Sequence, residues 1–223
     1  AAGQYVGLAA HCRHTSALAH ASTLATCAGV AMALVGSVGD GNASGAGDAI
    51  AVFIAARAAL PDPTQTDFDF VVTWNATALR DVNKYFVVED FNPSDISAAT
   101  DFNDGTLTAG PETLTLDINV NAGDALAAFT FAGHGGPPDN ASDTVVWTGL
   151  TENEQVNGPE NTVYSNAFAS AVAAATPRAI TSAETQPGSP LIVDQDGIVV
   201  RFGVAVAGGT VQQMMNSYRQ RRA

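Results

Sequence analysis

The segment 113–121, which reads TLTLDINVN, alternates apolar and polar residues without interruption. Successive side chains of an extended strand point to opposite faces, so the apolar residues of this segment share one face. That face consists of Leu114, Leu116, Ile118 and Val120. The same period returns over 198–206 and, less regularly, over 68–74. The pattern is typical of half-buried antiparallel strands. We expect the alternating apolar residues of 113–121 and those of 198–206 to share one core.

The composition limits the class of protein. A chain of 223 residues is long enough for one sizeable domain, and 46% hydrophobic against 14% charged residues is typical of a globular protein. The formal charge is −13, and Lys84 is the single lysine. Such a surface repels nucleic acid and anionic membranes. We therefore predict no specific nucleic-acid partner and no membrane partner.

The first 63 residues are predicted to form a helical N-terminal segment that packs on neighbours or on the core. Residues 15–39 carry no formal charge and are rich in small residues. A packed helix is the favoured interpretation, and a membrane anchor is the alternative. A second helix is predicted over 48–60, where Asp48 provides the N-cap and Pro61 ends the run. In a helix, Cys12 and Cys27 lie too far apart for a disulfide, so we expect two buried thiols.

Residues 64–223 are predicted to form the β-rich core. The expected strands lie near 67–75, 84–90, 113–121, 125–132, 144–149, 191–194 and 198–207. Tight turns are expected at 103–105 and 196–197, and a hairpin link at 121–124. Helices are predicted near 160–176 and 210–222. No internal repeat is visible. The predicted fold is mainly β with flanking helices (α+β), with an antiparallel β-sandwich or jelly-roll-like core.

One motif resembles that of a known enzyme family. Residues 9–12, AAHC, resemble the segment around the catalytic histidine of chymotrypsin-like serine proteases. The nearest counterpart of that family's serine motif is GHGGP at 133–137, which lacks both the aspartate and the nucleophilic serine. Acyl transfer of this kind requires the nucleophile. No protease activity is predicted.

Metal sites were sought among the histidines, cysteines and carboxylates. The N-terminal candidates are His11, Cys12, His14, His20 and Cys27. Only His11 and His14 approach zinc-ligand spacing, and no second pair follows. The segments 101–104 and 194–197 contain closely spaced acidic residues but lack the further ligands of a calcium loop. We therefore predict no metal, no cofactor and no catalytic or cofactor-binding residue. A glycosidase needs two carboxyl groups at a defined distance from each other, and the sequence does not give that distance. The carboxylates considered for it are Glu89, Asp90, Glu112, Glu152 and Glu154.

The overall character favours a structural, non-enzymatic subunit of a large assembly. The most concrete form is a viral capsid or capsid-decorating protein on the outer surface of a virion. Its partners are then copies of itself or a second capsid protein, held by the N-terminal segment and the C-terminal helix. The printed chain opens without methionine, which is expected of a processed product. The alternative is a secreted or surface β-sandwich module that binds or hydrolyses carbohydrate through Trp74, Tyr85 and Trp147.

Overall fold

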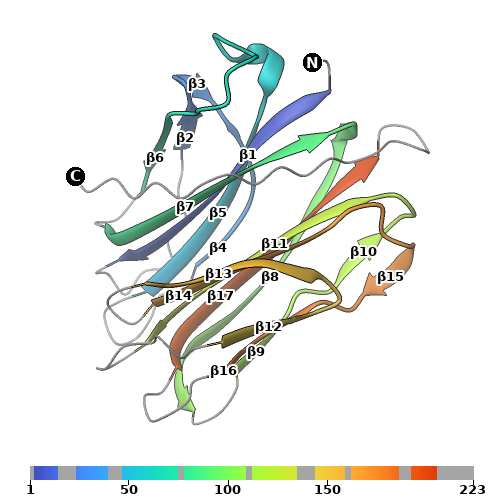
Figure 1. The fold of residues 1–223 in the computed structure, drawn as a ribbon. Coiled ribbons are helices and arrows are strands. Elements are labelled where there is room, and N and C mark those ends of the chain that lie inside the picture. The colour runs from blue at the N-terminus through green and yellow to red at the C-terminus, as the bar shows by residue number, and fades with distance from the viewer. Residues whose placement is uncertain are drawn as a thin grey trace.

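The computed structural model describes eight stretches of the chain. They are residues 3–14, 24–39, 47–74, 78–108, 112–134, 144–158, 162–185 and 192–204. Most of these residues belong to antiparallel strands, and the sheets that the strands form stack in four layers (Figure 1). In this described part the one helix is the 3-10 turn η1 (Arg57–Ala59). The predicted β-rich sandwich is therefore confirmed, whereas none of the predicted helices is found within the eight described stretches.

The two middle layers are the larger sheets. Inner sheet 1 has the strand order β4-β5-β1-β7 and inner sheet 2 has the order β13-β14-β11-β17-β8. The strands of inner sheet 1 are β1 (Gln4–His14), β4 (Ala33–Gly39), β5 (Gly47–Ala56) and β7 (Ala78–Glu89). Those of inner sheet 2 are β8 (Phe91–Thr108), β11 (Ala125–His134), β13 (Thr151–Gly158), β14 (Thr162–Ala169) and β17 (Ile192–Val204).

Smaller sheets cover the two inner sheets. Outer sheet 1 has the order β3-β2-β6 and comprises β2 (Leu24–Cys27), β3 (Val30–Ala31) and β6 (Phe70–Thr73). Outer sheet 2 has the order β12-β16-β9 and comprises β9 (Glu112–Thr115), β12 (Thr144–Thr148) and β16 (Thr181–Thr185). A two-stranded ribbon of β10 (Ile118–Val120) and β15 (Ala175–Arg178) lies beside it.

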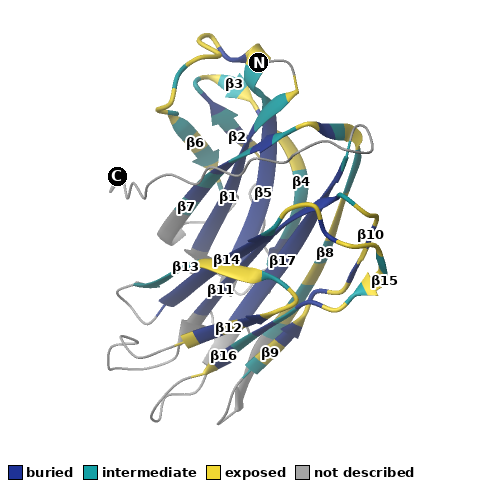
Figure 2. Cartoon of the chain, turned by 45° about the vertical axis from the view of Figure 1, so that its right-hand side comes forward, coloured by how far each residue is buried: buried dark blue, intermediate teal, exposed yellow. Residues whose placement is uncertain are grey.

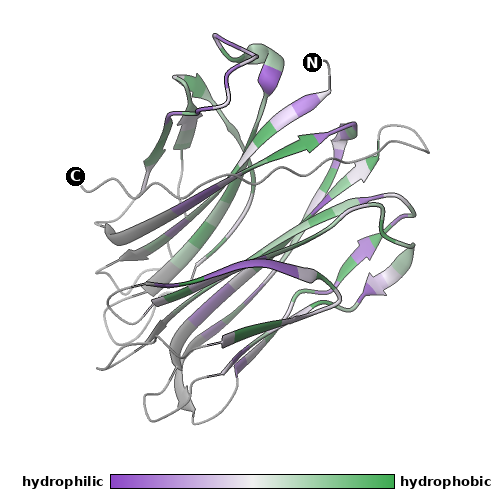
Figure 3. Cartoon of the chain, in the orientation of Figure 1, coloured by the Kyte–Doolittle hydropathy of each residue, from purple (hydrophilic) through white to green (hydrophobic). Residues whose placement is uncertain are grey.

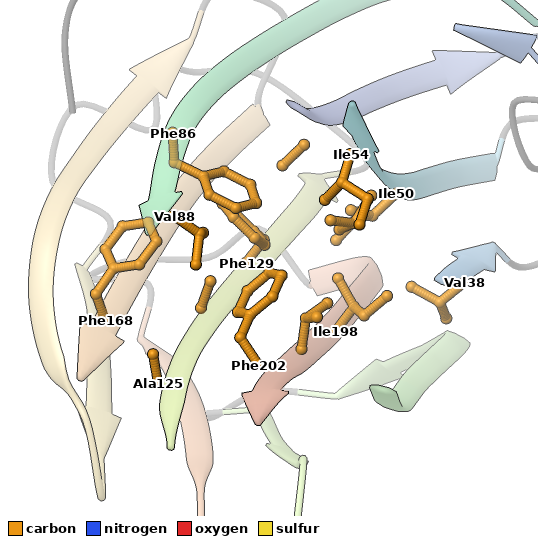
Figure 4. Close-up of a cluster of buried hydrophobic side chains, with 14 of the residues drawn as sticks. Val38, Ile50, Ile54, Phe86, Val88, Ala125, Phe129, Phe168, Ile198 and Phe202 are labelled. Atoms are coloured by element: carbon orange, nitrogen blue, oxygen red, sulfur yellow. The ribbon is translucent and has the colours of Figure 1, made fainter. Parts of the chain in front are cut away.

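Three hydrophobic cores separate the four layers. One core lies between outer sheet 1 and inner sheet 1, and another lies between inner sheet 2 and outer sheet 2. The third joins the two inner sheets and is rich in phenylalanine (Figure 4). Its ring contacts include Phe86–Phe129 at 5.7 Å and Phe86–Phe168 at 6.3 Å between centroids. The central strands of both inner sheets, such as β5, β11 and β14, are therefore buried on both faces (Figure 2).

Burial on both faces explains why the predicted helices are wrong. A strand with two buried faces is apolar throughout, so it loses the alternation that marks a half-buried strand. Strand β5 reads GDAIAVFIAA and occupies most of the region predicted as the helix 48–60. Likewise, β1 to β4 lie where the helical N-terminal segment 1–63 was predicted. Strands β14 and β15 replace the helix 160–176, and the helix 210–222 falls outside the described residues.

The predicted turns at 103–105 and 196–197 are also wrong, because both lie inside the paired strands β8 and β17. Gly197 serves a close approach between layers, since a Cβ there would lie 2.7 Å from Leu114 Cδ1. The turn 121–124 exists, with Asp124 N donating to Asn121 O at 3.2 Å. The turn connects strands of two different sheets and does not form a hairpin, because β10 pairs with β15 while β11 pairs with β14 and β17.

The chain contains a duplicated topology that the sequence analysis missed. The order β4-β5-β1-β7 recurs as β13-β14-β11-β17, in the same chain sequence of strands. The outer pair β2-β6 likewise recurs as β12-β16. We call inner and outer sheet 1 the first sandwich and inner and outer sheet 2 the second sandwich. Among the described strands, β8 and β9 of the second sandwich and the ribbon β10–β15 beside it have no counterpart in the first sandwich.

Irregularities of the backbone recur as well. The β4–β5 register shifts between Leu34 and Gly36, and the β13–β14 register shifts between Glu152 and Glu154. In each pair the extra residue is the third of its edge strand. The glycine pairs Gly3/Gly123 and Gly29/Gly149 all have positive φ, with 120 residues between the members of each pair. Shared bulges and turns show that the two sandwiches have one backbone plan.

Candidate functional sites: a buried ionic centre and two uncharged faces

Polar side chains gather in the core between the two sandwiches. They come from four strands and are all at most 4% exposed: His11, Lys84, Tyr164, Asn166 and Asp196. Burying polar and charged groups is costly unless they are paired. We call Lys84, Glu154, Tyr164 and Asn166 the ionic centre.

Lys84 is the centre's cation. Its Nζ lies 2.7 Å from Glu154 Oε2, and the exposed fractions of the two side chains are 4% and 37%. The same Nζ lies 5.6 Å from the centroid of the Tyr164 ring, within cation–π range. The lysine belongs to the first sandwich and its partners belong to the second. The ion pair therefore ties the two sandwiches together at one level of their shared core.

Tyr164 and Asn166 form the neutral side of the centre. Asn166 Nδ2 donates to Tyr164 Oη at 2.8 Å, while Asn166 Oδ1 is buried with no hydrogen-bond partner among the described residues. The His11 ring meets the Tyr164 ring edge to face at 4.5 Å. Burial raises the pKa of Tyr164 well above its usual value, with the Glu154 charge acting in the same direction. The tyrosine therefore stays neutral and acts as an acceptor for the amide.

Local sequence explains how these side chains meet. Lys84, Phe86 and Val88 alternate along β7, so the lysine shares the face that enters the apolar core. The bulge in β13 sets Glu154 beside Asn166 on β14. A lysine in phase with Phe86 and Val88 was the signal available in the sequence. The predicted strand 84–90 contains this lysine, but the prediction considered Lys84 only for its charge and not for the face of the strand on which it lies.

A second charged cluster lies near the C-terminal end of β17. Arg201 pairs with Asp95 and also lies 3.5 Å from Asp124 Oδ2 through Nη1. Asp124 is 1% exposed, and its carboxylate accepts the backbone N–H of Asn121 at 2.7 Å and of Val204 at 3.3 Å. These bonds fix the turn that leads into β11. This cluster is therefore structural.

The N-terminal metal candidates do not converge. On β1, His11 faces the core between the sandwiches, whereas Cys12 faces outer sheet 1. Cys27 lies on β2 of that outer sheet and faces inner sheet 1. No disulfide joins the two buried thiols. Burial and the nearby Asp69 charge raise the pKa of Cys27 to about 11. His20 and the side chain of His14 fall outside the described residues. Across the described stretches, no group of three or more His, Cys, Asp or Glu is arranged to hold a metal.

The acidic candidates form ties between strands. Asp101 accepts the backbone N–H of Thr115 at 2.7 Å, and Glu112 accepts from Asn103 at 2.6 Å. Glu89 accepts from Gln4 across the pair of strands β1 and β7. Asp196 is fully buried, and the side chains of Asp104 and Asp194 fall outside the described residues. Each of the contacts described here connects neighbouring segments of the fold.

The three aromatic residues considered for carbohydrate stacking do not share one surface. Trp147 is 8% exposed in the core of the second sandwich, where its Nε1 donates to Ser165 Oγ at 2.8 Å. Trp74 packs against the core of the first sandwich. Tyr85 stacks with Phe68 and Phe70 at centroid distances of 5.7 and 5.9 Å.

The outward face of outer sheet 2 carries no charged residue among its alternating positions. These positions are Thr113, Thr115, Thr144, Val146, Thr148, Thr181, Ala183 and Thr185. The register aligns Thr148, Thr181 and Thr115 in one row across the three strands. Figure 3 shows the contrast between apolar β12 and hydrophilic β13, which belongs to the layer beneath.

The outward face of outer sheet 1 is uncharged as well. Its alternating positions are Leu24, Thr26, Ala31, Val71 and Thr73. Leu24 is 64% exposed and Val71 is 61% exposed, against 57% for Val146 on the other outer sheet. Within their strands, both ends of the four-layer stack therefore expose apolar and hydroxyl side chains without charge, while the exposed Asp69 and Asp117 lie just beyond β6 and β9.

No helix in the described stretches has the length and apolar character needed to cross a membrane. Comparison with protein-family models, with curated proteins and with solved structures gives no significant match.

Proposed function

We propose that the chain is a structural, non-enzymatic subunit of a large assembly, in which copies or coat partners meet through the uncharged outer faces. The most concrete form is a viral capsid or capsid-decorating protein located in the virion. The observation that carries the proposal is the absence of charge from the outward strand positions described for both outer sheets, on a chain with a formal charge of −13.

Copies of this acidic chain repel each other wherever their charged surfaces meet. Two strongly acidic surfaces repel, and like charges placed face to face disfavour an interface. A face without charge removes that penalty at the place of contact. The exposed Leu24, Val71 and Val146 supply apolar area there, and the threonines supply both methyl groups and hydroxyls. Because the two faces lie on opposite sides of the stack, each subunit can contact neighbours on two sides (Figure 1).

The interior of the protein also suits a structural role. Two buried cations hold neighbouring parts of the fold together, since Lys84 pairs with Glu154 across the sandwiches and Arg201 pairs with Asp95 and Asp124. Such contacts hold the layers in register. A rigid stack presents its two outer faces at fixed relative positions, which a repeating assembly requires.

The test compares the oligomeric state of matched aspartate variants. Val146→Asp and Leu24→Asp each place a charge on one outer face, and Ala122→Asp places the same charge in an exposed turn away from both faces. Native mass spectrometry and light scattering should show assemblies for the wild type and the Ala122 variant. We expect smaller species for at least one outer-face variant, with unchanged circular dichroism. A genuine interface should bury at least about 1,000 Å² in total.

A wild-type protein that stays monomeric at the highest attainable concentration, both alone and with its natural partners, would contradict the proposal. Retention of full assembly by both outer-face variants would show that copies meet elsewhere on the molecule.

A further inference from the structure

We propose that Lys84 and Asn166 form a covalent amide cross-link between the two sandwiches, with Glu154 carrying the proton. The reaction joins Lys84 Nζ to Asn166 Cγ and releases the side-chain nitrogen of Asn166 as ammonia. The inference is independent of the assembly proposed above.

The register of the sheets places the reacting groups together. Glu154 pairs with Asn166 in the β13–β14 ladder, and Lys84 Nζ already contacts Glu154 at 2.7 Å. Phe86 faces Phe168 and Lys84 faces Tyr164, so β7 and β14 run in the same direction across the core. Lys84 lies two residues before Phe86, and Asn166 lies two residues before Phe168. The lysine therefore reaches the part of β14 that carries Asn166.

The surroundings exclude water from the nucleophile and the amide. Lys84 is 4% exposed and Asn166 is fully buried. The rings of Tyr164, Phe86, Phe129 and Phe168 form the apolar environment. In such a medium a separated ammonium and carboxylate are costly. Transfer of one proton from Nζ to Oε2 across their 2.7 Å contact gives a neutral amine, which is the nucleophilic form of lysine.

The amide is held for attack. Asn166 Nδ2 donates to Tyr164 Oη at 2.8 Å, which fixes the amide plane. Asn166 Oδ1 has no hydrogen-bond partner in the described structure, so it is open to a hydrogen bond from Glu154 once Glu154 has taken the lysine proton, and such a donor stabilises the charge that develops on this oxygen. Fixed proximity of two reactants replaces an encounter in solution and can supply a large part of the rate.

The reaction balances with the groups present. Glu154 takes one proton from the Lys84 ammonium, and the amine electron pair forms the new bond to Asn166 Cγ. Glu154 then moves a proton from the attacking nitrogen to the departing nitrogen, in the manner of a general acid and base. The Cγ–Nδ2 bond breaks and ammonia leaves, and it takes up the remaining proton as ammonium. Nothing is oxidised or reduced. The 37% exposure of the Glu154 side chain gives the product a path to solvent.

Mass spectrometry of the intact, denatured wild-type protein tests the proposal. We expect a mass lower than that of the sequence by about 17 Da, the mass of the ammonia lost in this modification. Because Lys84 is the only lysine, an endoproteinase that cuts after lysine provides a second readout. It should leave the cross-linked chain uncut, since the acylated lysine is no longer a substrate. Peptide sequencing should locate the bond between Lys84 and Asn166.

Variants separate the three roles. Glu154→Gln keeps the shape of the side chain but cannot accept the proton, so we expect the full sequence mass and cleavage after Lys84. Asn166→Ala and Lys84→Met remove one reacting group each and should also retain the sequence mass. Asn153→Ala changes the exposed bulge residue next to Glu154 and should still lose ammonia. Loss of the cross-link in Glu154→Gln should lower the thermal midpoint by about 10 °C.

The wild-type measurement decides the matter even if a variant fails to fold. A folded wild-type protein that keeps its full sequence mass after prolonged incubation, and is cut after Lys84, would overturn the proposal. A mass loss that maps to a different amide would overturn the role of Asn166. Loss of ammonia from Glu154→Gln at the wild-type rate would overturn the role of Glu154.

Discussion

The two sandwiches share one backbone plan but differ in chemistry where they meet. One row of paired residues crosses inner sheet 1 and its equivalent crosses inner sheet 2. The first row is Gly36, Val52, Ala9 and Lys84. The second row is Glu154, Asn166, Phe129 and Ile198. Every member of the ionic centre in these rows therefore has an apolar or glycine counterpart in the other sandwich.

The contacts between the rows are reciprocal. Lys84 of the first sandwich contacts Glu154 of the second. The equivalent residues, Ile198 and Gly36, are also neighbours, because a Cβ on Gly36 would lie 3.1 Å from Ile198 Cδ1. Reciprocal contacts of this kind are typical of the two-fold interface of a homodimer. The comparison shows that the fold needs complementary shapes at these positions, whereas the ionic chemistry is specific to one of the two contacts.

The largest effect is expected when the apolar contact receives the chemistry of the ionic one. Ile198→Lys would bury an ammonium opposite Gly36, which has no side chain to pair with it. An unpaired buried charge should lower the free energy of unfolding by about 3–5 kcal/mol. Chemical denaturation of this variant measures the loss.

Asn119→Lys is the matched control, because Asn119 is exposed on β10 and should tolerate the change within about 0.5 kcal/mol. A loss below about 1 kcal/mol for Ile198→Lys would show that the two rows do not face each other as described.

A smaller effect should distinguish the equivalent turns that follow β2 and β12. Gly29 and Gly149 have φ of 80° and 85°, so alanine at either position is strained by about 1 kcal/mol. Their surroundings differ, since a Cβ on Gly149 would lie 2.3 Å from the carbonyl oxygen of Ala179, while Gly29 has no atom within 4 Å of that position. Gly149→Ala should therefore cost about 1–3 kcal/mol more than Gly29→Ala.

Thermal and denaturant unfolding of the two alanine variants compare the turns directly. Equal losses of stability would mean that the second sandwich leaves Gly149 as open as Gly29.

The sequence predicts the half-buried strands well. Alternation correctly identifies the buried residues Leu114, Leu116, Ile118 and Val120. The prediction of a single core is wrong, because Leu116 lies in the core of the second sandwich while Phe202 lies between the sandwiches. A strand pattern specifies which residues are buried, but not how many layers the strands form.

Apolar–polar alternation does not identify the strands that have two buried faces. In β5 and β14 the apolar runs have no period of two, and their alanines favour a helical interpretation. The ionic centre combines residues that are far apart in the chain. The register of the strand pairs and the bulge in β13 bring these residues together. The duplication was missed because equivalent positions carry different residues, as Lys84 and Ile198 show.

Amide hydrogen exchange across the two sandwiches tests the central claim most directly. If both have the same topology, residues 5–12 of β1 and 126–132 of β11 are central strands, each paired on both sides. Their amides should be among the slowest to exchange and should be protected to a similar degree, while the edge strands β4 and β13 exchange faster. Exchange of residues 5–12 at the rate of an edge strand, with 126–132 still protected, would contradict the duplicated sandwich.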